Sequence, residues 1–216
     1  MVAKNNETSS ICAGIIFVGC LLAFFSLLGC LCSGYNSWKN KTCETECPIT
    51  KEKFVVQNNK NEPEWVREEV ARRLANIVKK VDVLVNHMSA KHLPDAVIAD
   101  RLYNRWQMIR SNPKGLRETS PGENSAAYTI NKGEQMRICV RDERSDNLFE
   151  NENDTMFVIL HELGHLMSKS FGHNLEFKKN FAYITKVAVE LDLYKYQNYA
   201  EKPTTYCNVD ITHTAY

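Results

Sequence analysis

The sequence predicts an α+β domain with an N-terminal single transmembrane helix. Three observations predict it: an uncharged apolar run, two short β-rich runs joined by a turn, and helical apolar periodicity on both sides of that turn. The chain has 216 residues, enough for one ordinary domain and an appendage. Its 27 basic and 26 acidic residues nearly cancel, which argues against a strongly basic nucleic-acid-binding protein.

The first predicted element is a membrane span over residues 11–32, which contain no charged residue and no proline. As a helix this run would be about 33 Å long, enough to cross a bilayer core. A signal peptide or a buried core helix is the alternative, but the run is long for a signal peptide and lacks a convincing cleavage site. We therefore expect an N-terminal tail (1–10), the span, a polar linker (33–59) and a single-pass membrane protein.

The domain itself begins with a long helix predicted over 63–89. Apolar residues recur there at steps of three and four, with charged residues on the other faces. The apolar stripe is wider than a coiled-coil seam, which favours packing on a sheet. A second periodic segment, 95–109, predicts a helix followed by a strand, and a short strand is expected at 116–119.

A β-hairpin is predicted next, from the runs 126–130 and 135–141. They are joined by a four-residue turn that contains Gly133, as hairpin turns commonly do. The second run alternates apolar and polar side chains, which is typical of a strand with one buried face. We expect the exposed edge of this second strand to bind an extended substrate as an extra strand.

Two helices close the domain. Thr155 is a plausible N-cap for an almost wholly apolar helix that continues to about residue 167 and is therefore expected to be buried. Gly172 interrupts the chain before a second amphipathic helix at about 174–192. Residues 201–216 are predicted to be a C-terminal tail.

Several cysteine and histidine residues receive no catalytic assignment from the sequence. Cys43 and Cys47 could form a local disulfide or stay as free thiols, and the pairing of Cys139 and Cys207 cannot be deduced. Three histidines have no partner at ligand spacing and are expected in surface or capping roles: His87, His92 and His213.

The apolar helix carries the chemically specific motif, H-E-x-x-H. His161 and His165 are four residues apart, so their imidazoles lie on one helical face and can bind one metal ion. Glu162 is one step further round and can accept a proton from a water at that ion. A buried helix is a costly place for these polar side chains unless something pairs with them, which favours a metal site.

A catalytic zinc ion needs a third protein ligand and an open position. His173 is preferred, because it follows the pair by eight residues and a glycine-containing turn could bring it back over the metal. Glu176 and Glu190, on the following helix, remain alternatives. The metzincin pattern is excluded, since it requires glycine and histidine where this chain has Ser168 and Phe171.

These segments resemble the WLM metallopeptidase family, which is related to the SprT-like peptidases. The resemblance rests on AAYTINKGEQMRICVR at 126–141, MFVILHELGH at 156–165 and FGHNLEF at 171–177, and it extends over about 60–200. It implies a zincin-like fold, a small sheet with the HExxH helix, and cleavage of polypeptides. It also implies a zinc site completed by a histidine closely followed by an aromatic residue, here His173 and Phe177.

Some members of that family act on proteins crosslinked to DNA, but a predicted membrane span replaces their DNA- and partner-binding tails here. We therefore do not carry that role over, and no nucleic-acid partner is expected. The span, the domain and the sequence YCNVDIT at 206–212 together resemble membrane-anchored WLM-domain proteins of large DNA viruses. That resemblance implies a viral membrane or virion location, with membrane or virion proteins as partners.

The resulting functional prediction is a membrane-anchored zinc metallopeptidase acting on polypeptides. His161, His165 and His173 would hold Zn²⁺, and Glu162 would act as the general base. The alternative is a non-catalytic, zinc-stabilised structural or interaction protein of a viral membrane or virion.

Overall fold

The computed structural model describes residues 41–120, 123, 125–142 and 149–216. Packing divides the chain into Met1–Lys41 and Thr42–Tyr216, and every element described below belongs to the second unit. In chain order these are β1 (Thr42–Glu46), β2 (Lys53–Gln57), α2 (Glu64–Ala90), α3 (Ala96–Ser111), β3 (Leu116–Glu118), β4 (Ala127–Ile130), β5 (Gln135–Ile138), α4 (Glu152–Met167), α5 (Leu175–Glu190), β6 (Thr204–Tyr206) and β7 (Val209–Ile211).

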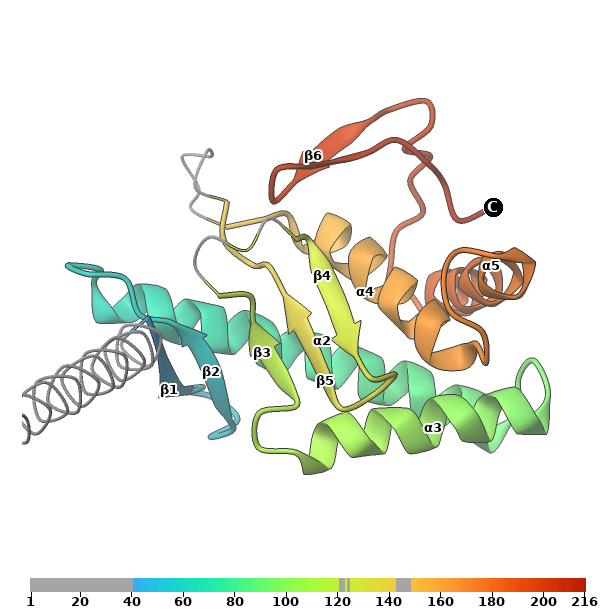
Figure 1. Ribbon diagram of the computed structural model, residues 1–216, viewed down its shortest axis with the longest axis horizontal. Coiled ribbons are helices and arrows are strands. Elements are labelled where there is room, and N and C mark those ends of the chain that lie inside the picture. The colour runs from blue at the N-terminus through green and yellow to red at the C-terminus, as the bar shows by residue number, and fades with distance from the viewer. Residues whose placement is uncertain (1–40, 121–122, 124, 143–148) are drawn as a thin grey trace, which may run out of the picture. The chain divides into compact units, whose positions relative to one another are not determined.

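Five strands form one mixed sheet in the order β1–β2–β3–β5–β4 (Figure 1). β2 and β5 each run parallel to β3, whereas the two outer pairs are antiparallel. The predicted hairpin is present as β4 and β5. However, β5 lies between two strands, so the prediction that strand 135–141 offers a free edge is wrong: β4 is the edge strand on that side.

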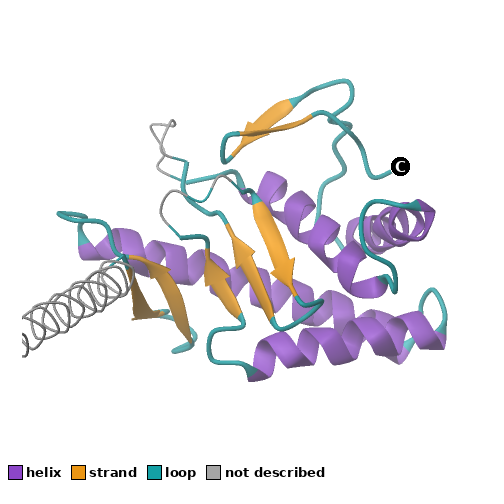
Figure 2. Cartoon of the chain, in the orientation of Figure 1, coloured by secondary structure: helices purple, strands orange, loops and turns teal. Residues whose placement is uncertain are grey.

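The helices bury the apolar stripes that their sequences predict. α2 passes behind the sheet in Figure 2 and contacts β1, β2 and β3. Its buried side includes Leu74, Val81 and Met88, each fully buried. α3 packs against α2 and α4, while α4 lies between β4 and α5. Because α4 is covered on several sides, its almost wholly apolar sequence is buried as predicted.

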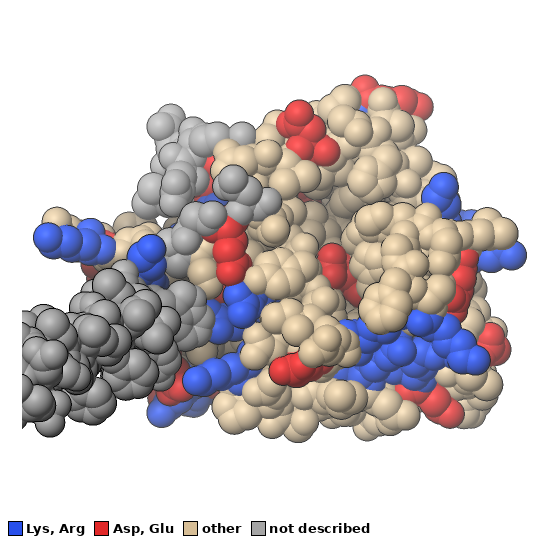
Figure 3. All heavy atoms as spheres, viewed as in Figure 1, with Lys and Arg blue, Asp and Glu red and all other residues tan. Residues whose placement is uncertain are grey.

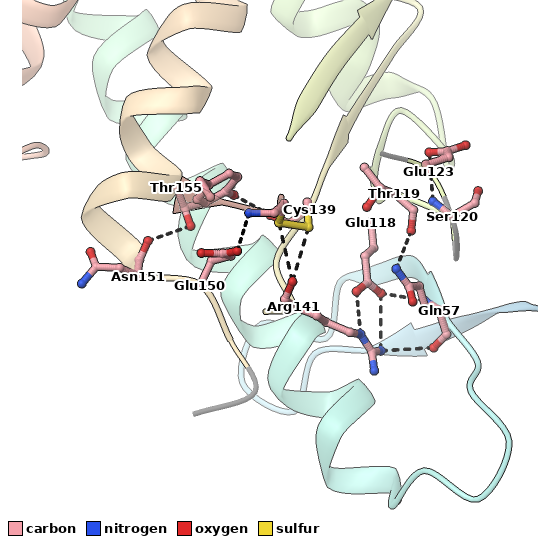
Figure 4. Close-up of a disulfide and its surroundings, with 12 residues drawn as sticks. Gln57, Glu118, Thr119, Ser120, Glu123, Cys139, Arg141, Glu150, Asn151 and Thr155 are labelled. Carbon is pink, nitrogen blue, oxygen red and sulfur yellow. Dashed lines mark hydrogen bonds and ion pairs between the residues drawn. A yellow bond between two sulfur atoms is a disulfide. The ribbon is translucent and has the colours of Figure 1, made fainter. Parts of the chain in front are cut away.

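A buried arginine joins the sheet to the start of α2. The guanidinium of Arg141 donates to Glu118 Oε1 at 2.6 Å and to the Gln57 carbonyl oxygen at 3.2 Å (Figure 4). It also pairs with Glu62, just before α2. Burial raises the pKa of Glu118, and the adjacent Arg141 opposes that rise by favouring the charged form.

Residues 33–59, predicted to be a polar linker, contain β1 and β2. The sequence of β2 holds only a short apolar run, Phe54–Val56, which is too short to show a clear period. All three of its residues are buried against the core, together with Cys47. Cys43 and Cys47 are free thiols rather than a local disulfide.

Residues 201–216, predicted to be a tail, begin with the β6–β7 hairpin. A disulfide joins Cys207, in the turn of this hairpin, to Cys139 just after β5 (Figure 4). The Tyr206 ring is fully buried, and its hydroxyl donates to the Cys139 carbonyl oxygen at 2.5 Å. The segment is therefore part of the domain. Sequence alone did not reveal this, because the two cysteines are 68 residues apart.

The predicted fold class requires a correction in its membrane component. The four helices within the described residues include none that is both long and apolar enough to cross a membrane. The apolar α4 has 16 residues and is about 24 Å long, while the longer α2 carries charged side chains along its length. The N-terminal transmembrane helix and the single-pass membrane location are therefore not supported. The span was predicted over 11–32, which lies outside the described residues.

The start of α4 also differs from the prediction. The N-cap is Asn151, whose side chain accepts hydrogen bonds from the backbone N–H groups of Asn153 and Asp154. Thr155 lies inside the helix, where its hydroxyl donates to the Asn151 carbonyl oxygen at 2.9 Å. The sequence pattern does not reveal this earlier start, because a first helical turn that faces solvent has no apolar period.

Candidate metal centre

α4 presents two imidazoles on one face. His161 and His165 are one helical turn apart, and their ring centroids are 5.0 Å from each other. Glu162 follows His161, and its side chain is buried beside β4 rather than among the rings. This is the arrangement that the H-E-x-x-H spacing predicts.

His173 joins this pair from the loop between α4 and α5. The chain turns at Gly172, whose φ of 77° lies in the left-handed region that glycine adopts readily. The His173 Nε2 atom is then 2.9 Å from Nε2 of His161 and 3.2 Å from Nε2 of His165. The sequence-predicted third histidine therefore lies with the other two.

The three histidines have a geometry suited to zinc. Each offers a ligand atom, and these atoms all lie within 4.8 Å of one another. Zinc–nitrogen bonds of about 2.1 Å in a tetrahedral site place the nitrogens about 3.4 Å apart. The Nε2 separations from His173 are a few tenths of an ångström shorter, so a small outward movement of its loop would admit the ion.

Burial keeps the two helical imidazoles neutral. Desolvation, with a smaller contribution from the neighbouring histidines, lowers the pKa of His161 to about 3 and that of His165 to about 4. A neutral imidazole keeps a lone pair free, which is the form that binds metal ions. At neutral pH these two rings can therefore bind a cation.

Glu162 is held apart from the imidazoles by the edge strand. The hydroxyl of Thr129, in β4, donates to Glu162 Oε2 at 2.8 Å. Burial raises the pKa of Glu162 to about 7, while the hydrogen bonds from Thr129 oppose that rise. A carboxylate with a pKa near neutrality is suited to accept and return a proton.

The loop that carries His173 is held by a lysine from the β4–β5 turn. The ammonium of Lys132 donates to the carbonyl oxygens of Ser168, Lys169 and Ser170 at 3.0, 2.5 and 2.6 Å. It also lies 4.3 Å from the centroid of the Phe171 ring. One side chain therefore fixes four consecutive residues just before the third histidine.

Two arginines of α3 bind the end of α4 in the same way. Arg101 donates to the Met167 carbonyl oxygen at 2.5 Å, and Arg105 donates to those of Leu166 and Ser168. Basic side chains gather in Figure 3 where α3 passes the end of α4. Cations are favourable at a helix C-terminus, where carbonyl groups lack partners within the helix.

Glu176, an alternative third ligand in the sequence, has a different role. Its carboxylate accepts hydrogen bonds from the backbone N–H groups of Lys169 and Ser170 and from the Ser170 hydroxyl at 2.5 Å. These bonds, that of the Ser170 hydroxyl foremost, lower the pKa of Glu176 to about 2. Glu176 therefore stabilises the loop, while Glu190 lies at the far end of α5.

An aromatic ring from α5 covers the cluster on its inner side. The Phe177 ring stacks on that of His165 at 4.2 Å and lies 4.8 Å from the rings of both His161 and His173. α5 can approach this closely because Gly164 has no side chain; a Cβ there would lie 3.2 Å from Phe177. The ring thereby restricts the orientations of all three imidazoles.

Two cavities adjoin the cluster, and His161 and His173 line both. The first has a volume of about 390 Å³ and includes Glu162; the second has a volume of about 510 Å³. The remaining residues of the first are Ala127, Tyr128, Thr129, Asn131, Lys132, His165, Phe171 and Gly172. The remaining residues of the second are Phe177, Lys178, Phe181, His213, Thr214 and Ala215.

His213 is exposed, in keeping with the surface role that the sequence predicts. The sequence did not place it near the cluster, yet its ring lies 6.3 Å from that of His161 and 5.9 Å from that of Phe157. No spacing rule could identify it, because it follows His161 by 52 residues and a disulfide-linked hairpin brings it back to the cluster.

Comparisons with known proteins identify viral relatives. No family model matches the chain. It is 26% identical to an uncharacterised protein of Acanthamoeba polyphaga mimivirus over 200 residues, which are 91% of this chain and 94% of that protein. It is 28% identical over 151 residues to an uncharacterised protein of Invertebrate iridescent virus 6, covering 68% of this chain and 78% of the relative.

Among solved structures, the chain is similar to Wss1 from Saccharomyces cerevisiae. The match has 19% sequence identity, covers 45% of this chain and 76% of that one, and has a TM-score of 0.33. A TM-score this low supports no inference about function. The candidate function therefore follows from the geometry of the cluster itself.

Proposed function

We propose that this protein is a zinc-dependent metallopeptidase that hydrolyses peptide bonds in polypeptides. The observation that carries the proposal is the gathering of three imidazoles beside a buried carboxylate, at the wall of an open cavity. A zinc ion bound there would polarise a substrate carbonyl and acidify a water molecule.

Glu162 supplies the acid–base chemistry. Its carboxylate accepts a proton from the attacking water as the water oxygen bonds to the carbonyl carbon. The carbon–nitrogen bond then breaks, and the same proton passes to the departing amine. Thr129 keeps one carboxylate oxygen in place through its 2.8 Å hydrogen bond, which leaves the other oxygen for the water.

The substrate has a natural binding site along β4. This strand is at the edge of the sheet, and Ala127, Tyr128 and Thr129 line the cavity that contains Glu162. An extended peptide can pair with the free backbone groups of an edge strand, which gives affinity without sequence specificity. Polypeptides in extended conformation therefore suit this cleft.

A non-catalytic zinc protein is the competing function. The contacts of Phe177 with all three histidine rings favour it, because a metal at this point would also stabilise the packing of α4 on α5. Such a role does not explain why a carboxylate is buried next to the cluster, where its desolvation costs stability.

A cleavage assay of the full chain with unfolded casein distinguishes the metallopeptidase from the non-catalytic zinc protein. We expect chelator-sensitive cleavage by wild type, and a Glu162→Gln variant that retains one zinc per chain but loses cleavage by a factor of at least about 100. Glu190→Gln is the matched control, since it makes the same chemical change at an exposed position on α5. Equal cleavage by Glu162→Gln and wild type would exclude the proposed chemistry.

A further inference from the structure

The C-terminal segment after β7 returns to the histidine cluster and forms one wall of the second cavity. His213, Thr214 and Ala215 line this cavity together with His161 and His173. The His213 ring lies 5.9 Å from that of Phe157, one helical turn before His161. A histidine is thus placed beside the candidate metal centre by a part of the chain outside the H-E-x-x-H helix and the His173 loop.

This segment is fixed on both sides of His213. Before it, Ile211 is buried in the core, and the β6–β7 hairpin is held by the Cys139–Cys207 disulfide. After it, the Tyr196 hydroxyl lies 2.8 Å from Thr214 Oγ1 and donates to the Tyr216 carbonyl oxygen at 3.1 Å. The imidazole therefore has a defined place at the cavity.

His213 lies outside the group of metal ligands. The ligand atoms that come within 4.8 Å of one another belong to His161, His165 and His173 and do not include those of His213. Its ring is 6.3 Å from that of His161, whereas the rings of the three clustered histidines are about 5 Å apart. A role next to the centre, rather than in it, fits these distances.

His213 and Glu162 line different cavities beside the cluster. The cavity that Glu162 lines does not include His213, and the cavity that His213 lines does not include Glu162. His161 and His173 border both. A peptide that extends from one cavity into the other would therefore pass the cluster with the carboxylate on one side and the imidazole on the other.

We propose that His213 donates a hydrogen bond to the carbonyl oxygen of the scissile peptide as negative charge develops on it. This inference rests on the proposed peptidase function. When water adds to the carbonyl carbon, the C=O π electron pair moves to the oxygen, and an imidazole N–H can donate to it. When the carbon–nitrogen bond breaks, that pair re-forms the C=O bond, so His213 keeps its proton throughout.

Two substitutions in the full chain distinguish the contribution of the His213 N–H group from that of its aromatic ring. His213→Phe keeps an aromatic ring beside Phe157 but removes the N–H, whereas His213→Gln keeps an N–H donor without the ring. Loss of one such donor lowers kcat by about 100-fold, and we expect this in His213→Phe with KM little changed. We expect His213→Gln to recover much of the loss.

Other kinetic outcomes would overturn the inference. Wild-type kcat in His213→Phe would show that the N–H is dispensable. Increased cleavage would show that the segment obstructs the cleft, and a change confined to KM would assign His213 to substrate binding alone. Recovery by His213→Phe but not by His213→Gln would assign the ring to packing.

A binding measurement tests the donor without any cleavage. Inorganic phosphate, a tetrahedral oxyanion, is titrated into the Co²⁺-loaded protein while its visible absorption is recorded. We expect His213→Phe to bind phosphate about tenfold more weakly, with unchanged Co²⁺ affinity. Unchanged phosphate affinity would refute the donor, and weakened Co²⁺ binding would make His213 a ligand. If wild type cleaves no casein, the peptidase proposal fails while this measurement still decides the role of His213.

Discussion

Lys132 connects the β4–β5 turn to the loop that carries His173, and its removal offers a direct test of how that histidine is held. The substitution Lys132→Met keeps most of the apolar stem and removes the ammonium from three carbonyl oxygens. Of these, the Ser168 oxygen also accepts a hydrogen bond from Arg105 at 2.8 Å. The other two belong to residues exposed enough to bind water instead.

We therefore expect Lys132→Met to lose the free energy of about one hydrogen bond from a charged donor, not of three. Hydrogen bonds to a charged group contribute about 1.5–3 kcal/mol each, and water replaces part of this here. If this lost free energy had stabilised the loop conformation that places His173 beside the other two histidines, zinc affinity should fall by about 10- to 100-fold. This is the range for outer-shell partners of metal ligands.

Competition with a chromogenic zinc chelator measures this affinity in the full chain. Lys169→Met is the matched control, because it removes the same charge from an exposed lysine of the same loop. We expect the control to bind zinc like wild type. Equal zinc affinity in Lys132→Met, Lys169→Met and wild type would show that the Lys132 ammonium does not hold the His173 loop for zinc binding.

Two further predictions concern stability. Replacing Cys139 and Cys207 together by serine should lower the free energy of unfolding by about 4 kcal/mol, because their disulfide closes a loop of 68 residues; urea denaturation measures this, and a loss below about 1 kcal/mol would contradict it. Metal-free Glu162→Gln should lose stability as the pH falls from about 6.5 to 4, because the unfolded chain binds protons on histidines whose folded pKa values are about 3 and 4. The substitution removes the opposing effect of Glu162, whose raised pKa makes wild type lose stability as the pH rises from about 4.5 to 7. If the unfolding temperature of the variant did not fall as the pH is lowered from about 6.5 to 4, the lowered pKa values of His161 and His165 would be contradicted.

Local patterns predicted the elements that surround the cluster. The i, i+4 spacing placed His161 and His165 on one face, because an α-helix repeats every 3.6 residues. The turn around Gly133 predicted the β4–β5 hairpin, where three consecutive residues have positive φ values. These features depend on a few neighbouring residues, which is why the sequence alone revealed them.

Contacts between distant segments were not predictable in this way. Nothing near Lys132 indicates that its ammonium reaches the loop after α4, and nothing near His213 indicates that it returns to His161. Both placements depend on how the sheet, α4 and the C-terminal hairpin pack together. The pairing of Cys139 with Cys207 belongs to the same class, because distance along the chain carries no information about it.

The strand order shows a further limit of local reasoning. The alternation within β5 correctly predicted a strand with one buried face. It could not reveal that β3 would pair with β5 and leave β4 at the edge, because pairing partners depend on the whole sheet. The proposed substrate strand therefore moves from β5 to β4.

If His161, His165 and His173 bind one zinc ion, the metal content of the full chain must show it. Elemental analysis after dialysis against limiting zinc should find one zinc per wild-type chain and a loss of most of it in His173→Ala. The His87→Ala control, a histidine of α2 outside the cluster, should retain one zinc. Full zinc occupancy in His173→Ala, or no zinc in wild type, would contradict the claim.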